Sequence, residues 1–357
     1  MEKRDKLHIV YILTKLELGG AQKVCLSLLQ GVKNKDFSTS LITGSSGALI
    51  EEAKKFDSVY FLDSFKREVG IKNIISEIKT FFSMIKRLRQ IKKNHSNLVV
   101  HTHSTKAGVF GRWAAFFAGI KHRVHTVHGF GFHDHQSKIA WGIIYSLEWI
   151  TAWITTHYVC VSKVDQEVGS RLLPKFSRKS SIIRAAVDWN KFYQPAVICA
   201  EKLETEVTRP FIFGNISCFK PQKNLFDLLK GFHFFYDRLK PEEAREVELH
   251  IIGDGVQREA IERWIVEHRL QKNIRLLGWQ ENVAPYLRKF DAFVMSSLWE
   301  GLPCSVIEAR LSHLPVVAYD VGGISEVISD GHNGFLVQPG DWRTLALRME
   351  QLYKNPL

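Results

Sequence analysis

Cysteine and long apolar runs are scarce in this chain of 357 residues. The five cysteines are scattered without paired spacing, which favours a reducing compartment over a disulfide framework. No group of cysteines and histidines has the spacing of a zinc site. The longest nearly apolar stretch, 139–161, is interrupted by Glu148 and His157, so no membrane-spanning helix is predicted.

Other signals are missing as well. Residues 1–6 are charged and the apolar run at 7–13 is too short for a signal peptide, so we expect a cytoplasmic protein. There is no tandem repeat, no low-complexity tract and no zinc-finger or RNP-like pattern, so nucleic-acid binding is not expected. The length and the 45% hydrophobic content predict two folded domains with substantial cores.

Positive charge is in excess, and much of it is local. The net charge is +12, and residues 66–93 hold nine basic and two acidic side chains. Apolar residues recur there at helical spacing, so the stretch predicts a long basic amphipathic helix. Two interpretations stay open: a helix docked on a sheet with a solvated basic face, or attraction to an anionic membrane or lipid phosphate. The second would make the protein peripheral on the inner face of the cytoplasmic membrane.

Short apolar runs alternate with amphipathic stretches in both halves. The predicted strands are 7–13, 38–43, 59–62, 98–101, 122–128, 158–161, 211–217, 248–252, 274–277, 292–295 and 315–319. The predicted helices are 21–30, 71–93, 107–118, 139–153, 225–239, 256–268, 282–289 and 303–312. This alternation predicts an α/β chain of two doubly wound parallel-sheet domains, 1–195 and 210–357, with a polar linker at 196–209. Ligands would bind in a central cleft at the carboxyl ends of the strands.

The most informative stretch lies between two predicted strands near the C-terminus. Glu300 and Glu308 stand eight positions apart, with the turn Gly301-Leu302-Pro303 between them. Proline suits the first turn of a helix, so Glu308 should lie inside a helix and Glu300 on the loop before it. The free amides of a helix N-terminus favour phosphate, which predicts a phosphorylated ligand here.

This arrangement resembles the Glu-x7-Glu motif of the retaining glycosyltransferases of family 4, which have a GT-B fold. The resemblance implies that Glu300 contacts the transferred sugar and that Glu308 holds the ribose hydroxyls of the nucleotide. A carboxylate suits a vicinal diol because it accepts two O–H bonds at once. Gly301, Leu302 and Gly323 would line the same donor site, the last offering backbone amides to the phosphates.

The family neutralises the donor diphosphate with an arginine and a lysine after the first strand of the second domain. Lys223 matches that lysine, Cys218 stands at the arginine position, and Lys220 is a candidate replacement for the missing charge. Gly253 and Trp279 follow later strands, in segments that line the nucleotide in the family, and Trp279 would flank the base.

In the first half, Gly20 belongs to a Gly-Gly pair after the first strand and matches a donor-binding turn of the family, although Gln22 replaces the usual acid. His128 matches the family's active-site histidine. His103 and Lys106 follow a buried strand and resemble acceptor-side motifs. The alternative is that these polar residues only cap the ends of strands.

The resemblance implies transfer of a sugar with retention, from a nucleotide-sugar with uracil as the favoured base, to a lipid-linked saccharide in cell-surface polysaccharide or lipopolysaccharide synthesis. Glu300, His128 and Lys223 are the catalytic candidates. No Asp-x-Asp occurs, so neither a metal nor another cofactor is expected. A nucleotide-sugar epimerase of the same fold and a non-catalytic membrane-associated scaffold remain alternatives.

Overall fold

The computed structural model describes residues 6–32, 37–65, 74–193, 209–244 and 246–355. The chain divides into two compact units, 1–186 and 187–357. Helix α7 (Trp189–Phe192) packs in the second unit, where the Phe192 carbonyl accepts a 3.2 Å hydrogen bond from Ser312 Oγ. The boundary between the units therefore falls before α7, whereas we predicted a first domain that extends to 195. All but the last residue of the predicted linker, 196–209, lie outside the described residues.

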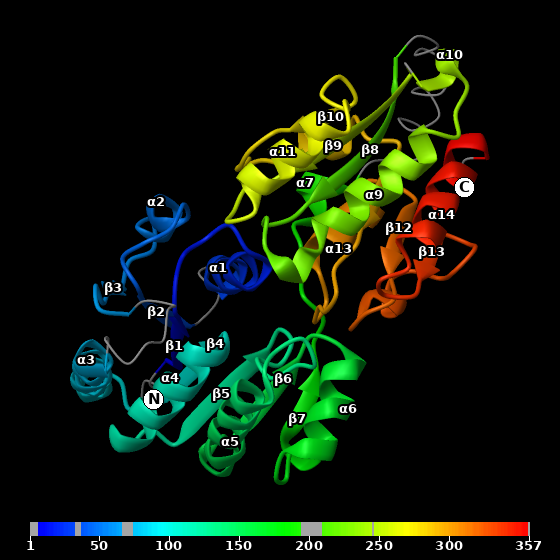
Figure 1. Ribbon diagram of the computed structural model, residues 1–357. Coiled ribbons are helices and arrows are strands. Elements are labelled where there is room, and N and C mark those ends of the chain that lie inside the picture. The colour runs from blue at the N-terminus through cyan, green and yellow to red at the C-terminus, as the bar shows by residue number, and fades with distance from the viewer. Residues whose placement is uncertain (1–5, 33–36, 66–73, 194–208, 245, 356–357) are drawn as a thin grey trace. The chain divides into compact units, whose positions relative to one another are not determined.

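The first unit contains a seven-stranded parallel sheet in the order β3-β2-β1-β4-β5-β6-β7 (Figure 1). Its strands are β1 (His8–Leu13), β2 (Ser38–Thr43), β3 (Val59–Phe61), β4 (Leu98–His103), β5 (His122–Val127), β6 (His157–Cys160) and β7 (Ser180–Ile182). Its helices are α1 (Gly20–Val32), α2 (Ile50–Ala53), α3 (Ile74–Asn94), α4 (Thr105–Phe117), α5 (Lys138–Ile154), α6 (Lys163–Leu172) and the 3₁₀ turn η2 (Ser177–Lys179).

Alternate residues of β1 face opposite layers of this unit, as the two-residue period of a strand requires. Tyr11 and Leu13 pack with α1, while Val10 and Ile12 pack with α3 and α4. The sheet is therefore covered on both faces. Ser162 caps α6, because its hydroxyl accepts a 3.0 Å bond from the Asp165 amide.

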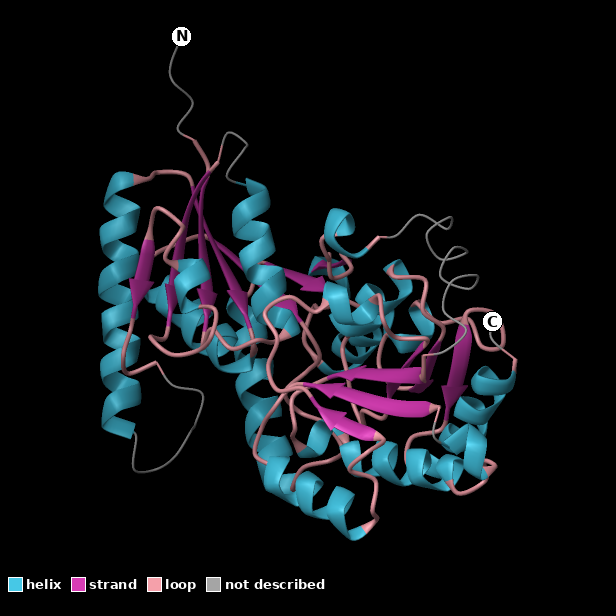
Figure 2. Ribbon diagram, turned by 90° about the horizontal axis from the view of Figure 1, so that it is seen from above, coloured by secondary structure: helices cyan, strands magenta, loops and turns pink. Residues whose placement is uncertain are grey.

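The second unit contains a six-stranded parallel sheet in the order β10-β9-β8-β11-β12-β13, again with helices on both faces (Figure 2). Its strands are β8 (Phe211–Ile216), β9 (Val247–Ile252), β10 (Ile274–Leu276), β11 (Ala292–Met295), β12 (Val316–Tyr319) and β13 (Gly334–Val337). Its other elements are η3 (Pro221–Lys223), α9 (Leu225–Tyr236), α10 (Pro241–Ala244), α11 (Arg258–Glu267), α12 (Ala284–Leu287), α13 (Cys304–Leu311), η4 (Ile324–Glu326) and α14 (Trp342–Lys354).

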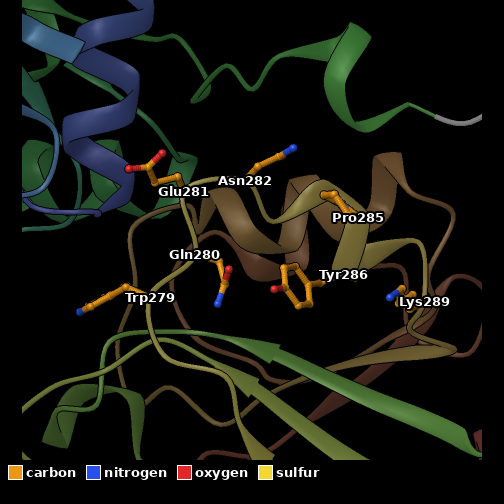
Figure 3. Close-up of a pocket in the computed structure, with 7 residues that line it drawn as sticks. All are labelled: Trp279, Gln280, Glu281, Asn282, Pro285, Tyr286 and Lys289. Atoms are coloured by element: carbon orange, nitrogen blue, oxygen red, sulfur yellow. The ribbon is translucent and has the colours of Figure 1, made fainter. Parts of the chain in front are cut away.

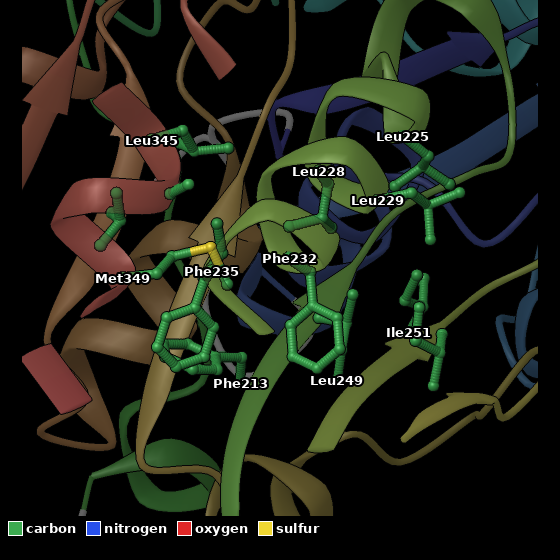
Figure 4. Close-up of a cluster of buried hydrophobic side chains, with 14 of the residues drawn as sticks. Phe213, Leu225, Leu228, Leu229, Phe232, Phe235, Leu249, Ile251, Leu345 and Met349 are labelled. Atoms are coloured by element: carbon green, nitrogen blue, oxygen red, sulfur yellow. The ribbon is translucent and has the colours of Figure 1, made fainter. Parts of the chain in front are cut away.

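The larger core of the second unit lies between its sheet and the helices α9 and α14 (Figure 4). Phe232 and Phe235 of α9 meet Phe213 of β8, while Leu345 and Met349 pack from α14. All five side chains are fully buried. Truncating one of these phenylalanines to alanine should cost about 3–5 kcal/mol. This core holds the central strands in place, and the loops at their carboxyl ends are built on them.

The predicted α/β class, parallel sheets and two domains are confirmed. The first residues of the predicted basic helix, 66–73, lie outside the described residues, and the rest forms α3. Only the later part of its apolar face is buried: Ile75 is 78% exposed and Phe82 is 64% exposed. None of the described helices is long and apolar enough to cross a membrane.

Candidate active site

The loops after β8 and β11 lie side by side, because these strands are neighbours in the sheet. Ser296 Oγ donates to the carbonyl oxygens of Lys223 (3.1 Å) and Asn224 (2.9 Å). The Leu298 amide donates to the carbonyl of Gln222 at 2.8 Å. These bonds hold the loop that carries Lys223 against the loop that carries Glu300.

Lys223 and Glu300 meet at this edge of the sheet. The Lys223 ammonium donates to Glu300 Oε1 in a short ion pair. The two side chains are 15% and 9% exposed, so water screens the pair only weakly. A cation and a carboxylate therefore lie together at the carboxyl edge of the second sheet.

Glu308 lies on α13, as predicted. The helix begins at Cys304, with Pro303 as its N-cap, and ends before Ser312. Glu308 is buried in its second turn. The sequence therefore predicted both the helix and the position of its glutamate correctly. Leu302 and Gly301, just before the helix, are buried as well.

Gly322 and Gly323 support the loop that carries Glu300. Gly322 has φ +57°, and a Cβ there would lie 2.1 Å from the Glu300 carbonyl oxygen. The Gly323 amide donates to the Gly301 carbonyl at 2.6 Å. These glycines allow the loops after β11 and β12 to touch backbone to backbone, so their first effect is to fix the position of Glu300.

Gly253 serves a similar purpose after β9. Its φ is +136°, and a Cβ would lie 1.9 Å from the carbonyl oxygen of Ser217, after β8. Its amide donates to the Gly278 carbonyl at 2.8 Å, which brings the residue before Trp279 to the same edge. Lys220 precedes the short turn η3, and its carbonyl accepts a 2.9 Å bond from the Lys223 amide.

A hollow of about 580 Å³ lies beside this edge (Figure 3). The segment after β10 and helix α12 supply its lining: Trp279, Gln280, Glu281, Asn282, Pro285, Tyr286 and Lys289. The indole of Trp279 is 43% exposed and points away from the Tyr286 ring. An exposed ring near a hollow can stack on a planar ligand.

Three histidines of the first unit, His101, His103 and His128, lie toward the carboxyl ends of β4 and β5, which are adjacent strands. His103 Nδ1 and His128 Nε2 are 3.0 Å apart and share a hydrogen bond whose direction depends on the tautomers. The ring of His101 lies 4.6 Å from that of His103, and its Nε2 hydrogen-bonds with Thr126 Oγ1 at 2.7 Å. His103 Nε2 is buried and has no hydrogen-bond partner among the described residues.

All three rings are neutral at ordinary pH. Burial lowers the pKa of His128 to about 4. Burial, with His128 as the next cause, lowers the pKa of His101 to about 3. Burial and then the neighbouring histidines hold the pKa of His103 well below its usual range. Within the described part of the chain, no group of three or more His, Cys, Asp or Glu is placed to hold a metal ion.

Lys106 and Gly20 also lie in the first unit, and Gly20 is exposed. The Lys106 ammonium donates to Glu77 Oε1 at 2.5 Å and lies 5.8 Å from the ring centre of Phe110. Gly20 is the first residue of α1. Lys106 is thus a bound cation whose approach to a ligand would require it to leave Glu77.

Three residues of this site escaped sequence reasoning: Gln222, Asn224 and Ser296. Asn224 has φ +45°, a conformation that asparagine adopts more readily than most residues, and this turn starts α9. An asparagine between a lysine and an apolar helix was a usable signal. The bonds that Ser296 donates join residues more than 70 positions away, and no local pattern predicts them.

This combination of two Rossmann-like units, a lysine and glutamate at one sheet edge and neutral histidines at another is that of a nucleotide-sugar-dependent glycosyltransferase. Residues 18–190 match the family described as "Glycosyltransferase Family 4", and residues 221–355 match the family described as "Glycosyl transferases group 1". One Escherichia coli protein is 30% identical over 342 residues, 94% of this chain and 85% of the relative. The chain therefore belongs to glycosyltransferase family 4.

The names of the relatives describe related enzymes. The Escherichia coli protein above is named UDP-Gal:alpha-D-GlcNAc-diphosphoundecaprenol alpha-1,3-galactosyltransferase. The O-antigen biosynthesis glycosyltransferase WbnH of Escherichia coli is 26% identical, over 93% of this chain and 86% of its own. Each name belongs to that protein.

Solved structures share the fold at low identity. Anabaena Alr3699/HepE, crystallised in complex with UDP-glucose, has a TM-score of 0.78 at 18% identity, over 98% of this chain and 90% of that one. TarM has a TM-score of 0.76 at 13% identity, over 99% and 93%. These likenesses show the GT-B fold.

Proposed function

We propose that this chain transfers a sugar, with retention and without a metal, from a UDP-sugar to a lipid-linked saccharide during synthesis of a cell-surface polysaccharide or lipopolysaccharide. The observation that carries the proposal is the Lys223–Glu300 pair at the edge of the second sheet. Its two groups match in chemistry the two ends of a sugar diphosphate.

On the donor side, a diphosphate would compete with Glu300 for the Lys223 ammonium. Its arrival releases the carboxylate, which can then accept hydrogen bonds from hydroxyls of the transferred sugar. Lys223 next stabilises the negative charge that grows on the leaving phosphate, together with backbone amides at the start of α13; the Gly323 amide, which we predicted for this role, instead donates to the Gly301 carbonyl. Glu308 would hold the ribose diol.

On the acceptor side, the neutral ring of His128 suits a hydrogen bond to a sugar hydroxyl. Its Nε2 shares a hydrogen bond with His103, so Nδ1 is the nitrogen left to face a ligand. A neutral imidazole has one nitrogen that donates and one that accepts, whereas an imidazolium could only donate. His103 and Lys106 would contact the acceptor or orient groups that do.

The proposed substrates rest on the relatives. The Escherichia coli relative is named for UDP-galactose and a diphosphoundecaprenol-linked sugar, and it covers most of this chain. Alr3699/HepE was crystallised with UDP-glucose. A UDP-sugar and a polyprenyl-diphosphate-linked saccharide are therefore the first substrates to test, with the protein at the cytoplasmic face of a membrane.

The test is nucleotide release by the purified protein from UDP-, GDP- and ADP-sugars in EDTA, with and without a polyprenyl-diphosphate-linked sugar. We expect release from one UDP-sugar, strongly increased by the lipid acceptor, and an α-linked product from an α-linked donor. Glu308→Ala should lower this turnover at least 100-fold. Isomerisation of the donor without acceptor would instead identify an epimerase, and no turnover or binding of any donor would leave a scaffold.

A further inference from the structure

Helix α5 buries two polar side chains and exposes several large apolar ones. Glu148 and Thr151 are buried. The outward side is apolar, with large exposed residues at helical spacing: Ile139, Ile143, Leu147, Ile150 and Trp153. Ile143 is 57% exposed and Trp153 is 54% exposed. A soluble helix normally turns this stripe toward a core.

Buried polar bonds fix this orientation. Arg112 of α4 donates to Glu148 Oε2 at 2.7 Å, and both side chains are almost fully buried. Trp113 Nε1 donates to Thr151 Oγ1 at 3.0 Å. Rotating α5 to hide its apolar stripe would leave the buried guanidinium without its carboxylate partner. The apolar side of α5 therefore faces outward as part of the fold.

Aromatic side chains continue this apolar side, and basic side chains accompany them. Phe116 and Phe117, at the end of the neighbouring helix α4, are exposed. The guanidinium carbon of Arg123 lies 5.6 Å from the ring centre of Phe116, and Lys175 Nζ lies 5.1 Å from that of Trp153. Aromatic rings beside lysine and arginine are typical of segments at a membrane–water interface.

The described helices α3, α4 and α5 lie side by side and contain only two acidic residues, Glu77 and Glu148 (Figure 1). Each is paired with a basic side chain of α4, Lys106 or Arg112. The basic residues of α3 have no comparable acidic partners along these helices. The layer is thus apolar and positively charged, and it complements an anionic lipid surface.

We propose that the outer side of α5, with Phe116 and Phe117, inserts into the interfacial layer of an anionic membrane. The 17 residues of α5 make a helix about 25 Å long, which would lie in the membrane plane. Binding would combine apolar insertion with charge attraction, so it would outlast the screening of charge by salt. The inference rests on the proposed function in one respect: membrane binding would bring the chain to a lipid-linked acceptor.

The test is flotation of the full chain with vesicles of phosphatidylglycerol and phosphatidylethanolamine, against vesicles of phosphatidylcholine, in 0.1 M and 1 M NaCl. The variant is Ile150→Ser with Trp153→Ser. The matched control is Val266→Ser with Leu347→Ser, two exposed apolar residues of the second unit. Thermal melting of each variant checks that the fold is intact.

We expect the chain to bind the anionic vesicles and to keep part of that binding in 1 M NaCl. The α5 variant should bind at least tenfold more weakly at both salt concentrations, and the control should bind within twofold of the parent chain. The proposal is overturned by absence of vesicle binding, or by binding that vanishes in high salt and ignores the α5 variant. If vesicles are not bound and the α5 variant abolishes self-association in sedimentation velocity, the exposed side of α5 contacts a second copy of the chain and the proposal is overturned.

Donor turnover with a short-chain, water-soluble acceptor separates this inference from the proposed function. Measured without vesicles, turnover should be the same in the α5 variant and in the parent chain. If the parent chain turns over no donor but its vesicle binding depends on α5, the proposed function fails and the membrane inference stands.

Discussion

At the scale of single residues, the Lys223–Glu300 pair makes a prediction about both stability and activity. Lys223→Met leaves a nearly buried carboxylate unpaired, so the free energy of unfolding should fall by about 1–3 kcal/mol. Adding Glu300→Gln removes the stranded charge and should recover at least half of that loss. Urea unfolding of the two variants measures the difference, and equal losses would contradict a direct interaction.

Both variants should lose turnover by about 100-fold or more, because each lacks a charge that we place at the reacting groups. This separates the two effects of the pair: the double variant regains stability but not activity. Recovery of turnover in the double variant would show that the pair acts only through the fold.

The histidine group predicts how stability depends on pH. The pKa of His101 is about 3 and that of His128 about 4 in the native state, while an unfolded histidine titrates near 6.5. The free energy of unfolding therefore holds the full contribution of these neutral histidines above pH 6.5. As the pH drops toward 4, it falls by about 1.4 kcal/mol per pH unit for each such histidine. Unfolding at pH 7 and pH 5 measures this slope. His101→Gln should make this slope shallower by about 1.4 kcal/mol per pH unit, the contribution of one proton, and an unchanged slope would contradict the assignment.

At the scale of elements, the loop after β12 offers a paired glycine test. Gly322→Ala places a Cβ 2.1 Å from the Glu300 carbonyl oxygen, whereas a Cβ at Gly331 meets nothing within 4 Å; both residues have positive φ. Gly331→Ala should cost about 1 kcal/mol for its backbone conformation alone. Gly322→Ala should cost at least twice as much and should also reduce turnover, because Glu300 moves. Urea unfolding and donor release measure the two effects, and equal costs would contradict the contact.

The sequence predicted most elements of both sheets, because buried parallel strands such as β11 and β12 are short apolar runs between helices. It missed β7, a three-residue strand with two serines, and β13, which begins with glycine. It predicted the position of α5 but not its orientation. That orientation depends on Arg112, 36 residues from its partner Glu148, and helical spacing alone carries no such information.

The same limit applies to the candidate site. Glu308 on its helix followed from Pro303 and local spacing. The contact between Lys223 and Glu300 joins residues 77 positions apart, and that between His103 and His128 joins residues 25 apart. Each pair is brought together by the order of strands in the sheet. The sequence therefore indicated these residues as site candidates but not that they contact each other.

At the scale of the whole molecule, the two compact units should respond separately to a ligand. Each has its own core, so calorimetry should resolve two unfolding transitions. UDP at about 100 times its Kd should stabilise the second unit by about 2.7 kcal/mol and raise that transition by about 5–10 °C. Glu308→Ala should abolish the shift. A shift of the first unit's transition alone would show that the nucleotide binds that unit and would contradict the proposed donor site.

The Lys223–Glu300 pair should also affect how well the site discriminates between a nucleotide-sugar and other cellular anions. An ammonium group that already pairs with a carboxylate should bind inorganic phosphate weakly. A single phosphate would have to break that ion pair, and it makes few other contacts that could offset the loss. In the proposed function, a nucleotide-sugar also gives Glu308 a ribose and the released Glu300 a sugar to bind. These added contacts can offset the loss of the Lys223–Glu300 pair. Because Glu300 competes with phosphate for the Lys223 ammonium, inorganic phosphate should inhibit donor binding more strongly in Glu300→Gln than in the parent chain.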